Sequence, residues 1–175
     1  MKNFLILICT FLALTSSSCN KKAKLSEQIN KQLDSLNHSL TLNASPQQVQ
    51  LLSDNIDAFI KEYPTDSLAS HYLFELSRVH QSRGDYKKAL ATLEQLEQKY
   101  PDAKETGMSV FMQGFIYANS LNELEKAKQK YKLYLQKFSA QNEKMTHDVK
   151  LELANLGKSA DEIFNSIQQK ADSGK

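Results

Sequence analysis

The sequence contains few of the residues that interrupt helices. Its 175 residues include only three Pro and five Gly, and the chain also has no Trp. Proline breaks helices and glycine weakens them, so their scarcity leaves long stretches that favour helix. Apolar residues make up 41% of the chain and charged residues 24%. This balance provides enough apolar material for a core and excludes wholesale disorder.

The chain also carries no large excess of positive or negative charge. The formal net charge is +2, and removing residues 1–19, whose only charged residue is Lys2, lowers it by one. Proteins that bind nucleic acids usually carry a broad basic field, which this chain lacks. We therefore expect no nucleic-acid partner.

The usual catalytic and metal-binding motifs are absent. The sequence has no HExxH, no Gly-rich phosphate loop, no CxxC pair and no GxSxG. The carboxylates of Glu94, Glu97, Asp102 and Glu105 could be imagined as an acid–base pair. At helix ends and on exposed faces they are instead predicted to be caps and solubilising charge. We expect no enzyme activity, no cofactor and no bound metal.

The N-terminus indicates export. Residues 4–14 form an eleven-residue apolar run, too short for a bilayer span of roughly 20 residues. Small residues then lead to Cys19, as in a bacterial lipoprotein signal peptide, which residues 1–18 resemble. The resemblance implies lipidation of Cys19 with palmitate-type chains. Because Asn20 is not Asp, it also implies an outer-membrane lipoprotein that faces the periplasm. Ser16 stands where such signals usually carry Leu, and an ordinary signal peptide leaving a free Cys19 thiol is the alternative.

The segment that follows the predicted signal peptide is short and rich in lysine. Residues 19–25 are predicted to be the lipid anchor and a short solvated tether, whose three lysines could alternatively bind anionic lipid. The other cysteine, Cys9, lies in the predicted signal peptide, so the mature chain cannot form an internal disulfide. The fold must therefore depend on packing.

Helical periodicity is present throughout the rest of the chain. After residue 25 the apolar residues recur with the 3.6-residue period of an α-helix and never alternate as in a strand. Caps, Pro and Gly divide the chain into predicted helices near 26–42, 46–62, 67–82, 85–99, 103–119, 122–138, 142–155 and 160–170. Short connections between them predict antiparallel hairpins.

A repeat is visible at the hairpin ends. "FIKEYPTD" and "LEQKYPDA" recur at 37 residues, measured from Pro64 to Pro101, and "YLQKFSAQ" follows at 38. A period in this range is typical of helical repeat proteins.

The residues at fixed positions of these hairpins resemble the tetratricopeptide repeat. Its best copy carries Leu73, Leu76, Ser77, His80, Gly84, Ala89, Leu93, Leu96 and Pro101. The next copy carries Gly114, Tyr117, Ala127, Tyr131, Tyr134 and Phe138, with one extra residue in its turn.

The resemblance implies an all-α, TPR-like solenoid of about four antiparallel helical hairpins. Residues 26–64 are the predicted degenerate N-terminal hairpin, 65–139 the two TPR-like repeats, and 140–175 a C-terminal capping hairpin and tail. More narrowly, the copies resemble those of BamD-like and Tol-Pal-associated TPR lipoproteins of the bacterial envelope.

In this repeat the first helix of each hairpin lines a partner-binding groove. By resemblance, the groove positions of the better copy are His71, Phe74, Arg78, Gln81 and Ser82. Those of the next copy are Met108, Phe111, Phe115, Ala118 and Asn119. The phenylalanines could instead pack against the neighbouring hairpin.

The implied function is that of a noncatalytic scaffold that binds a protein or peptide partner in the periplasm or at the outer membrane. One alternative is an accessory subunit of an outer-membrane assembly or division-coupled envelope complex. Another is an adaptor associated with a glycan or an envelope hydrolase.

Overall fold

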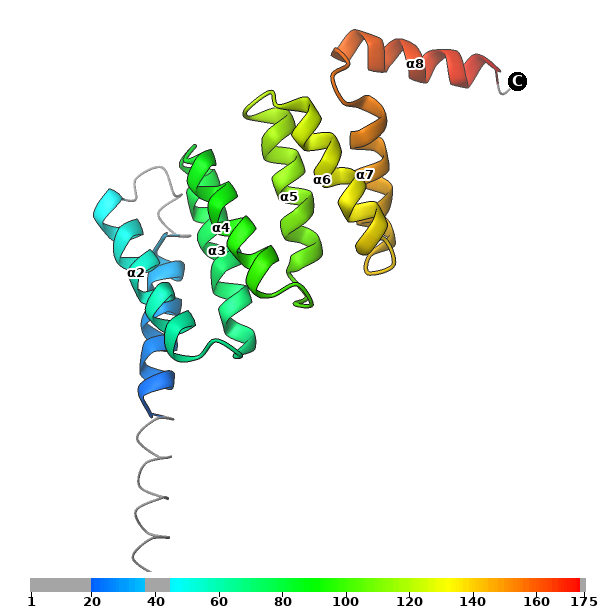
Figure 1. Ribbon diagram of the computed structural model, residues 1–175. Helices are drawn as coiled ribbons and strands as arrows, with labels where there is room; N and C mark the ends of the chain where they lie inside the picture. Colours follow the sequence, from blue (N-terminus) through cyan, green and yellow to red (C-terminus); the bar gives the residue numbers. More distant parts are fainter. Residues whose placement is uncertain (1–19, 37–44, 174–175) are drawn as a thin grey trace, which may run out of the picture. The chain divides into compact units, whose positions relative to one another are not determined.

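Every regular element that the structure describes is a helix. The computed structural model describes residues 20–36 and 45–173, and Figure 1 shows the helices in chain order. The predicted signal peptide and Cys19 lie outside these residues. The all-α fold class is therefore confirmed. The chain divides into two compact units, residues 1–85 and 86–175.

Unit 1 contains a helix over residues 20–36, followed by α2 (Pro46–Glu62) and α3 (Ser67–Ser82). The predicted start of α2 is confirmed in detail. Ser45 Oγ accepts a hydrogen bond from the Gln48 backbone N–H at 3.2 Å, and Gln48 Oε1 accepts one from the Ser45 N–H at 2.8 Å. This capping box, with Pro46 in the first turn, satisfies donors that a helix leaves unpaired.

The core of unit 1 is aliphatic with an aromatic end. Phe59 of α2 meets Tyr72 of α3 edge to face, with ring centroids 5.1 Å apart. Asn55 Nδ2 donates a hydrogen bond to Gln32 Oε1 at 3.0 Å, which joins α2 to the first helix. The buried apolar residues of the first helix and α2 are Ile29, Leu33, Leu36, Val49, Leu52, Ile56, Phe59 and Ile60.

The first helix differs from its prediction. The sequence predicts a helix over 26–42 preceded by a solvated tether, but residues 20–36 are helical. Lys21 Nζ lies 2.6 Å from Glu62 Oε1, and Lys22 forms an ion pair with Asp66. These partners are about 40 residues away in sequence, so local composition did not reveal them.

Unit 2 contains α4 (Tyr86–Lys99), α5 (Thr106–Asn119), α6 (Leu124–Lys137), α7 (Glu143–Asn155) and α8 (Ala160–Ser173). From α4 to α7, each helix packs against the next one in the chain, as predicted for consecutive hairpins. The last helix, α8, leads away from the end of α7 (Figure 1). The Phe164 side chain of α8 is 61% exposed.

Two of the predicted boundary signals are confirmed and one is wrong. Gly84 and Gly157 have φ values of +76° and +78°, the left-handed conformation that favours glycine after a helix. The third signal, at Pro101, predicts a helix from residue 103, but residues 101–105 form turns. Helix α5 begins at Thr106, whose Oγ1 donates a hydrogen bond to the Tyr100 carbonyl at 2.6 Å.

Candidate functional site

The predicted groove residues of α3 form one stripe of unit 1. From His71 to Gln81 the spacing of three or four residues places them on one side of the helix, and Ser82 directly follows Gln81. Phe74 is half-buried and Arg78 is exposed. The Arg78 guanidinium is held by Glu75 one turn earlier, with a nitrogen–oxygen distance of 3.0 Å. His71 and Gln81 are half-buried, and Ser82 is exposed. The side chains of this stripe are therefore at least partly exposed to solvent, and the charge of Arg78 is partly neutralised by Glu75.

The predicted residues of α5 form a second stripe, in unit 2. Met108, Phe111 and Phe115 are half-buried, and Asn119 is exposed. The Phe111 ring lies 6.2 Å from the ring of Phe115 and 6.1 Å from that of Tyr131 in α6. Phe111 therefore has a packing role beside its partly exposed surface. The α3 and α5 stripes belong to different units.

A hollow of about 620 Å³ opens beside the end of the α5 stripe. It lies between the α5–α6 turn, α7 and the turn that leads into α8, and we call it the α5–α7 hollow. Two predicted groove residues, Ala118 and Asn119, line it. Its other lining residues are Asn122, Leu124, Leu151, Glu152, Asn155, Leu156, Gly157, Lys158, Ser159 and Ile163.

Sequence reasoning missed the α7 side of this hollow. Residues 140–175 keep little of the repeat pattern beyond Gly157, so no groove position could be assigned there. The one available signal was the apolar period that makes α7 a helix next to α6. Leu151 is 48% exposed, so about half of its side chain is available to a bound partner.

The side chains of the hollow combine amides with apolar groups. The carboxamides of Asn122 and Asn155 each have donors and an acceptor, the same groups that a peptide backbone presents. Asn119 Nδ2 donates one hydrogen bond to the Phe115 carbonyl at 3.1 Å, which leaves its second N–H and its oxygen for the hollow. Leucine and isoleucine side chains supply apolar surface between them. Glu152 and Lys158 provide one charge of each sign. This chemistry suits a peptide segment better than a small charged ligand.

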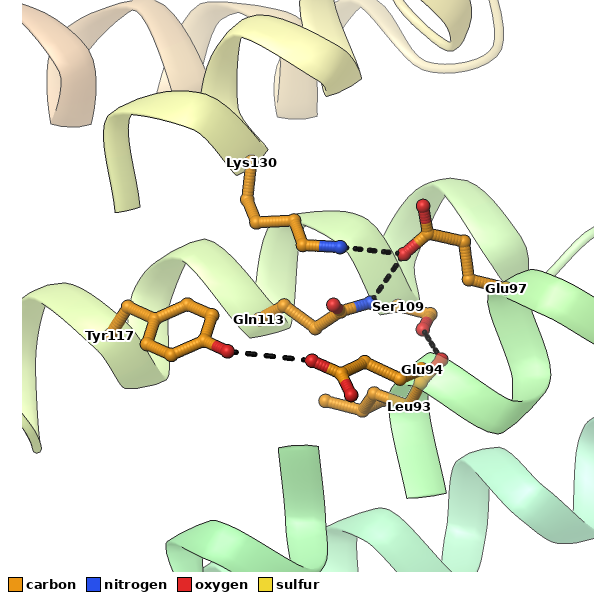
Figure 2. A network of polar contacts seen from close by, with 7 residues as sticks. All are labelled: Leu93, Glu94, Glu97, Ser109, Gln113, Tyr117 and Lys130. Atoms are coloured by element: carbon orange, nitrogen blue, oxygen red, sulfur yellow. Dashed lines mark hydrogen bonds and ion pairs between the residues drawn. The ribbon is translucent and has the colours of Figure 1, made fainter. Parts of the chain in front are cut away.

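Helix α5, which forms one side of the hollow, is bonded to α4 and, through Glu97 of α4, linked to α6. Figure 2 shows a polar network that joins α4, α5 and α6. Glu97 Oε2 accepts hydrogen bonds from Gln113 Nε2 at 2.9 Å and from Lys130 Nζ at 2.8 Å. Ser109 Oγ donates to the Leu93 carbonyl at 3.1 Å. One carboxylate therefore links three helices.

This network corrects the interpretation of Glu97 as solubilising charge. Its side chain is 25% exposed and that of Lys130 is 22% exposed. Burial acts to raise the pKa of the Glu97 carboxyl, but the hydrogen bonds from Lys130 and Gln113 outweigh it, so that the pKa lies below its ordinary value. Glu94 and Glu105 differ from the prediction too: Glu94 accepts a hydrogen bond from the Tyr117 hydroxyl at 3.4 Å, and Glu105 is buried.

A glycine sets the spacing of α5 and α6. A Cβ atom built on Gly114 would lie 2.6 Å from Cε1 of Tyr131, closer than such atoms approach in proteins. The Tyr131 ring therefore rests directly on the α5 backbone, and the ring is fully buried. The small residue of the second predicted repeat thus permits close helix packing, as the repeat pattern implies.

Unit 1 has a hollow of its own, with a different lining. It measures about 450 Å³ and lies between the first helix and α2. Leu36, Leu51 and the side chains of Lys24, Lys31 and Gln48 are among its lining residues. None of the predicted groove residues lies there.

The described residues contain no group of three or more His, Cys, Asp or Glu side chains placed to hold a metal ion. Among the same residues, no helix combines the length and the apolar character needed to cross a membrane.

Short-linked helices that pack on the next helix in the chain, α2 on α3 and each of α4 to α6 on its successor, are typical of a helical-hairpin repeat protein. Residues 72–103 match the family model described as "Tetratricopeptide repeat". The match covers the best-preserved copy and supports a tetratricopeptide repeat protein. Such repeats generally bind protein partners and typically form non-enzymatic scaffolds. Comparisons with curated proteins and with solved structures give no significant match.

Proposed function

We propose that this protein is a noncatalytic scaffold of the bacterial envelope, lipid-anchored through Cys19, that binds a peptide segment of a partner protein in the α5–α7 hollow. The observation that supports the proposal best is the position of the hollow. Groove residues assigned by resemblance, Ala118 and Asn119, share it with α7 residues that were not assigned. The anchor and the outer-membrane location rest on the sequence alone.

An extended peptide would meet complementary groups in this hollow. The carboxamides can pair with backbone N–H and C=O groups, while Leu151 and Leu124 cover an apolar side chain. The Glu97 network keeps α5 fixed to α4 and α6, so binding needs little ordering of the α5 side. Less ordering leaves more of the contact energy for affinity.

A pair of matched leucine variants tests this proposal. Leu151 in the hollow and Leu51 in unit 1 are 48% and 51% exposed, so Leu151→Ala and Leu51→Ala remove the same group from similar environments. Covering the exposed half of a leucine contributes about 1 kcal/mol, or roughly fivefold in affinity. We expect Leu151→Ala to weaken capture of the membrane-extracted partner by about that factor, and Leu51→Ala to leave it unchanged. Equal losses, or a loss accompanied by reduced helicity, would contradict the proposal.

A second function, that of a subunit in a larger outer-membrane or division-coupled complex, is favoured by α8. Its exposed Phe164 is an apolar side chain of the kind that anchors lasting interfaces. Phe164→Ser should then abolish a stable complex that co-purifies from membranes. A complex that survives this change would leave the peptide-binding scaffold as the better description.

A further inference from the structure

The first described helix leaves no room for a tether after Cys19. Asn20, the next residue in the sequence, is already helical. Lys21 Nζ lies 2.6 Å from Glu62 Oε1 near the end of α2, and Lys22 is ion-paired with Asp66, the N-cap of α3. The first turn of the helix is therefore tied to the turn that connects α2 and α3.

Asp66 links the first helix to the start of α3, because its two carboxylate oxygens bind different partners. Its Oδ1 accepts a hydrogen bond from the Leu68 backbone N–H at 2.9 Å, which caps α3, while its other oxygen pairs with Lys22. The hydrogen bond from Lys22, followed by that from Leu68, lowers the pKa of Asp66. The carboxylate thus stays charged across the neutral range, and the ion pair persists there.

The charges at this end of unit 1 suit a phospholipid surface. The carboxylates of Glu62 and Asp66 are each paired with a lysine, so neither presents an unneutralised negative charge. Lys24 and Lys61 add exposed positive charges. Anionic headgroups attract such lysines when they lie close to the membrane surface.

We propose that unit 1 rests on the membrane through this end, which we call the anchor-side face and define as residues 20–24 and 61–66. The proposal depends on lipidation of Cys19. An acylated residue lies at the headgroup level, and adjacent Cα atoms are only about 3.8 Å apart, so the first helical turn must lie there too. Through the two ion pairs, the α2–α3 turn lies at the same level.

This geometry distinguishes the two ends of α2. The helix has 17 residues, and at about 1.5 Å per residue its ends are about 25 Å apart. Thr65 belongs to the anchor-side face, whereas Gln47 lies at the opposite end of α2, and both are exposed. The two positions should therefore differ in their distance from lipid.

Quenching by headgroup-labelled lipid measures this difference. The mature chain has no cysteine besides Cys19, so Thr65→Cys and Gln47→Cys each add one site for a fluorophore once Cys19 is acylated. The full lipidated protein is placed in phosphatidylethanolamine–phosphatidylglycerol vesicles that contain a nitroxide-headgroup lipid. We expect several-fold stronger quenching at residue 65 than at residue 47. Equal quenching, or stronger quenching at residue 47, overturns the proposal.

A charge exchange tests the ion pairs themselves. Lys21→Glu sets two like charges against each other and should reduce quenching at residue 65. The double variant Lys21→Glu/Glu62→Lys restores the pair with reversed signs and should recover it. If the single variant quenches like the parent, the ion pairs do not hold the face at the membrane, and this proposal is wrong.

Sedimentation with the vesicles separates this inference from the proposed anchor. Protein that sediments with vesicles but shows no quenching at residue 65 is anchored in another orientation, so only the anchor-side face is refuted. Protein that does not sediment has no lipid anchor, and both proposals then fail.

Discussion

The ion pair between Glu97 and Lys130 provides the sharpest test of how unit 2 is held together. Their charged atoms lie 2.8 Å apart, and both side chains are about three-quarters buried. Exposed ion pairs contribute about 0.2–1 kcal/mol, and hydrogen bonds to charged groups contribute about 1.5–3 kcal/mol. The cost of burying Glu97 offsets part of the larger value. We therefore expect a coupling energy of about 1–2 kcal/mol.

A double-mutant cycle measures this coupling. It uses Glu97→Gln, Lys130→Met and the double variant, with the free energy of unfolding obtained from urea titration. The matched control is the pair of Glu27 and Lys31, whose charged atoms are 2.7 Å apart but whose side chains are 65% and 75% exposed. That pair should show a clearly smaller coupling, because both of its side chains are mostly in solvent. Equal coupling in the two cycles would refute the argument that burial gives the Glu97 pair its strength.

The same cycle predicts a dependence on pH. The folded-state pKa of Glu97 lies below its ordinary value of 4.5. Its contribution to stability is therefore complete above the unfolded-state pKa and is lost as the pH falls through the folded-state pKa. The difference in stability between the parent protein and Glu97→Gln should be constant near neutral pH and shrink below about pH 4.5. A difference that grows in acid would contradict the assignment.

Three further predictions concern other parts of the chain. Gly114→Ala should destabilise the protein by about 1–2 kcal/mol, because the clash with Tyr131 outweighs the better helix propensity of alanine; an increase in melting temperature would contradict the close packing. Ser45→Ala, which removes the side-chain acceptor for Gln48, should lower the free energy of unfolding by about 1 kcal/mol, and no change would mean that this cap is not stabilising. Cys19→Ala should release the protein from the membrane fraction, whereas continued retention would refute the lipid anchor.

The sequence allowed good predictions wherever the signals were local. The bounds of α2 and α3 agree with the predicted ranges 46–62 and 67–82, because Ser45, Pro46 and Pro64 act on their immediate neighbours. The close approach of α5 and α6 at Gly114 likewise follows from a small residue in a repeat position. Helix boundaries of this kind depend on backbone geometry, which a few residues determine.

Features that depend on distant residues were missed. The lysines at 21 and 22 look like a solvated tether until Glu62 and Asp66 are brought beside them. Glu97 looks like a surface charge until α6 supplies Lys130. The α7 wall of the hollow could not be assigned because its residues match no repeat position. In each case the partner is 30 or more residues away or lacks a motif, and only the packed structure pairs it.

Photo-crosslinking in intact cells tests the central claim most directly. A benzophenone amino acid is placed at Asn119, at Leu151 and, as the control, at Leu51. The account predicts that Asn119 and Leu151, which face the same hollow from different helices, crosslink to one common partner band that Leu51 does not give. Crosslinks of equal strength from all three positions, or none from the hollow, would contradict it.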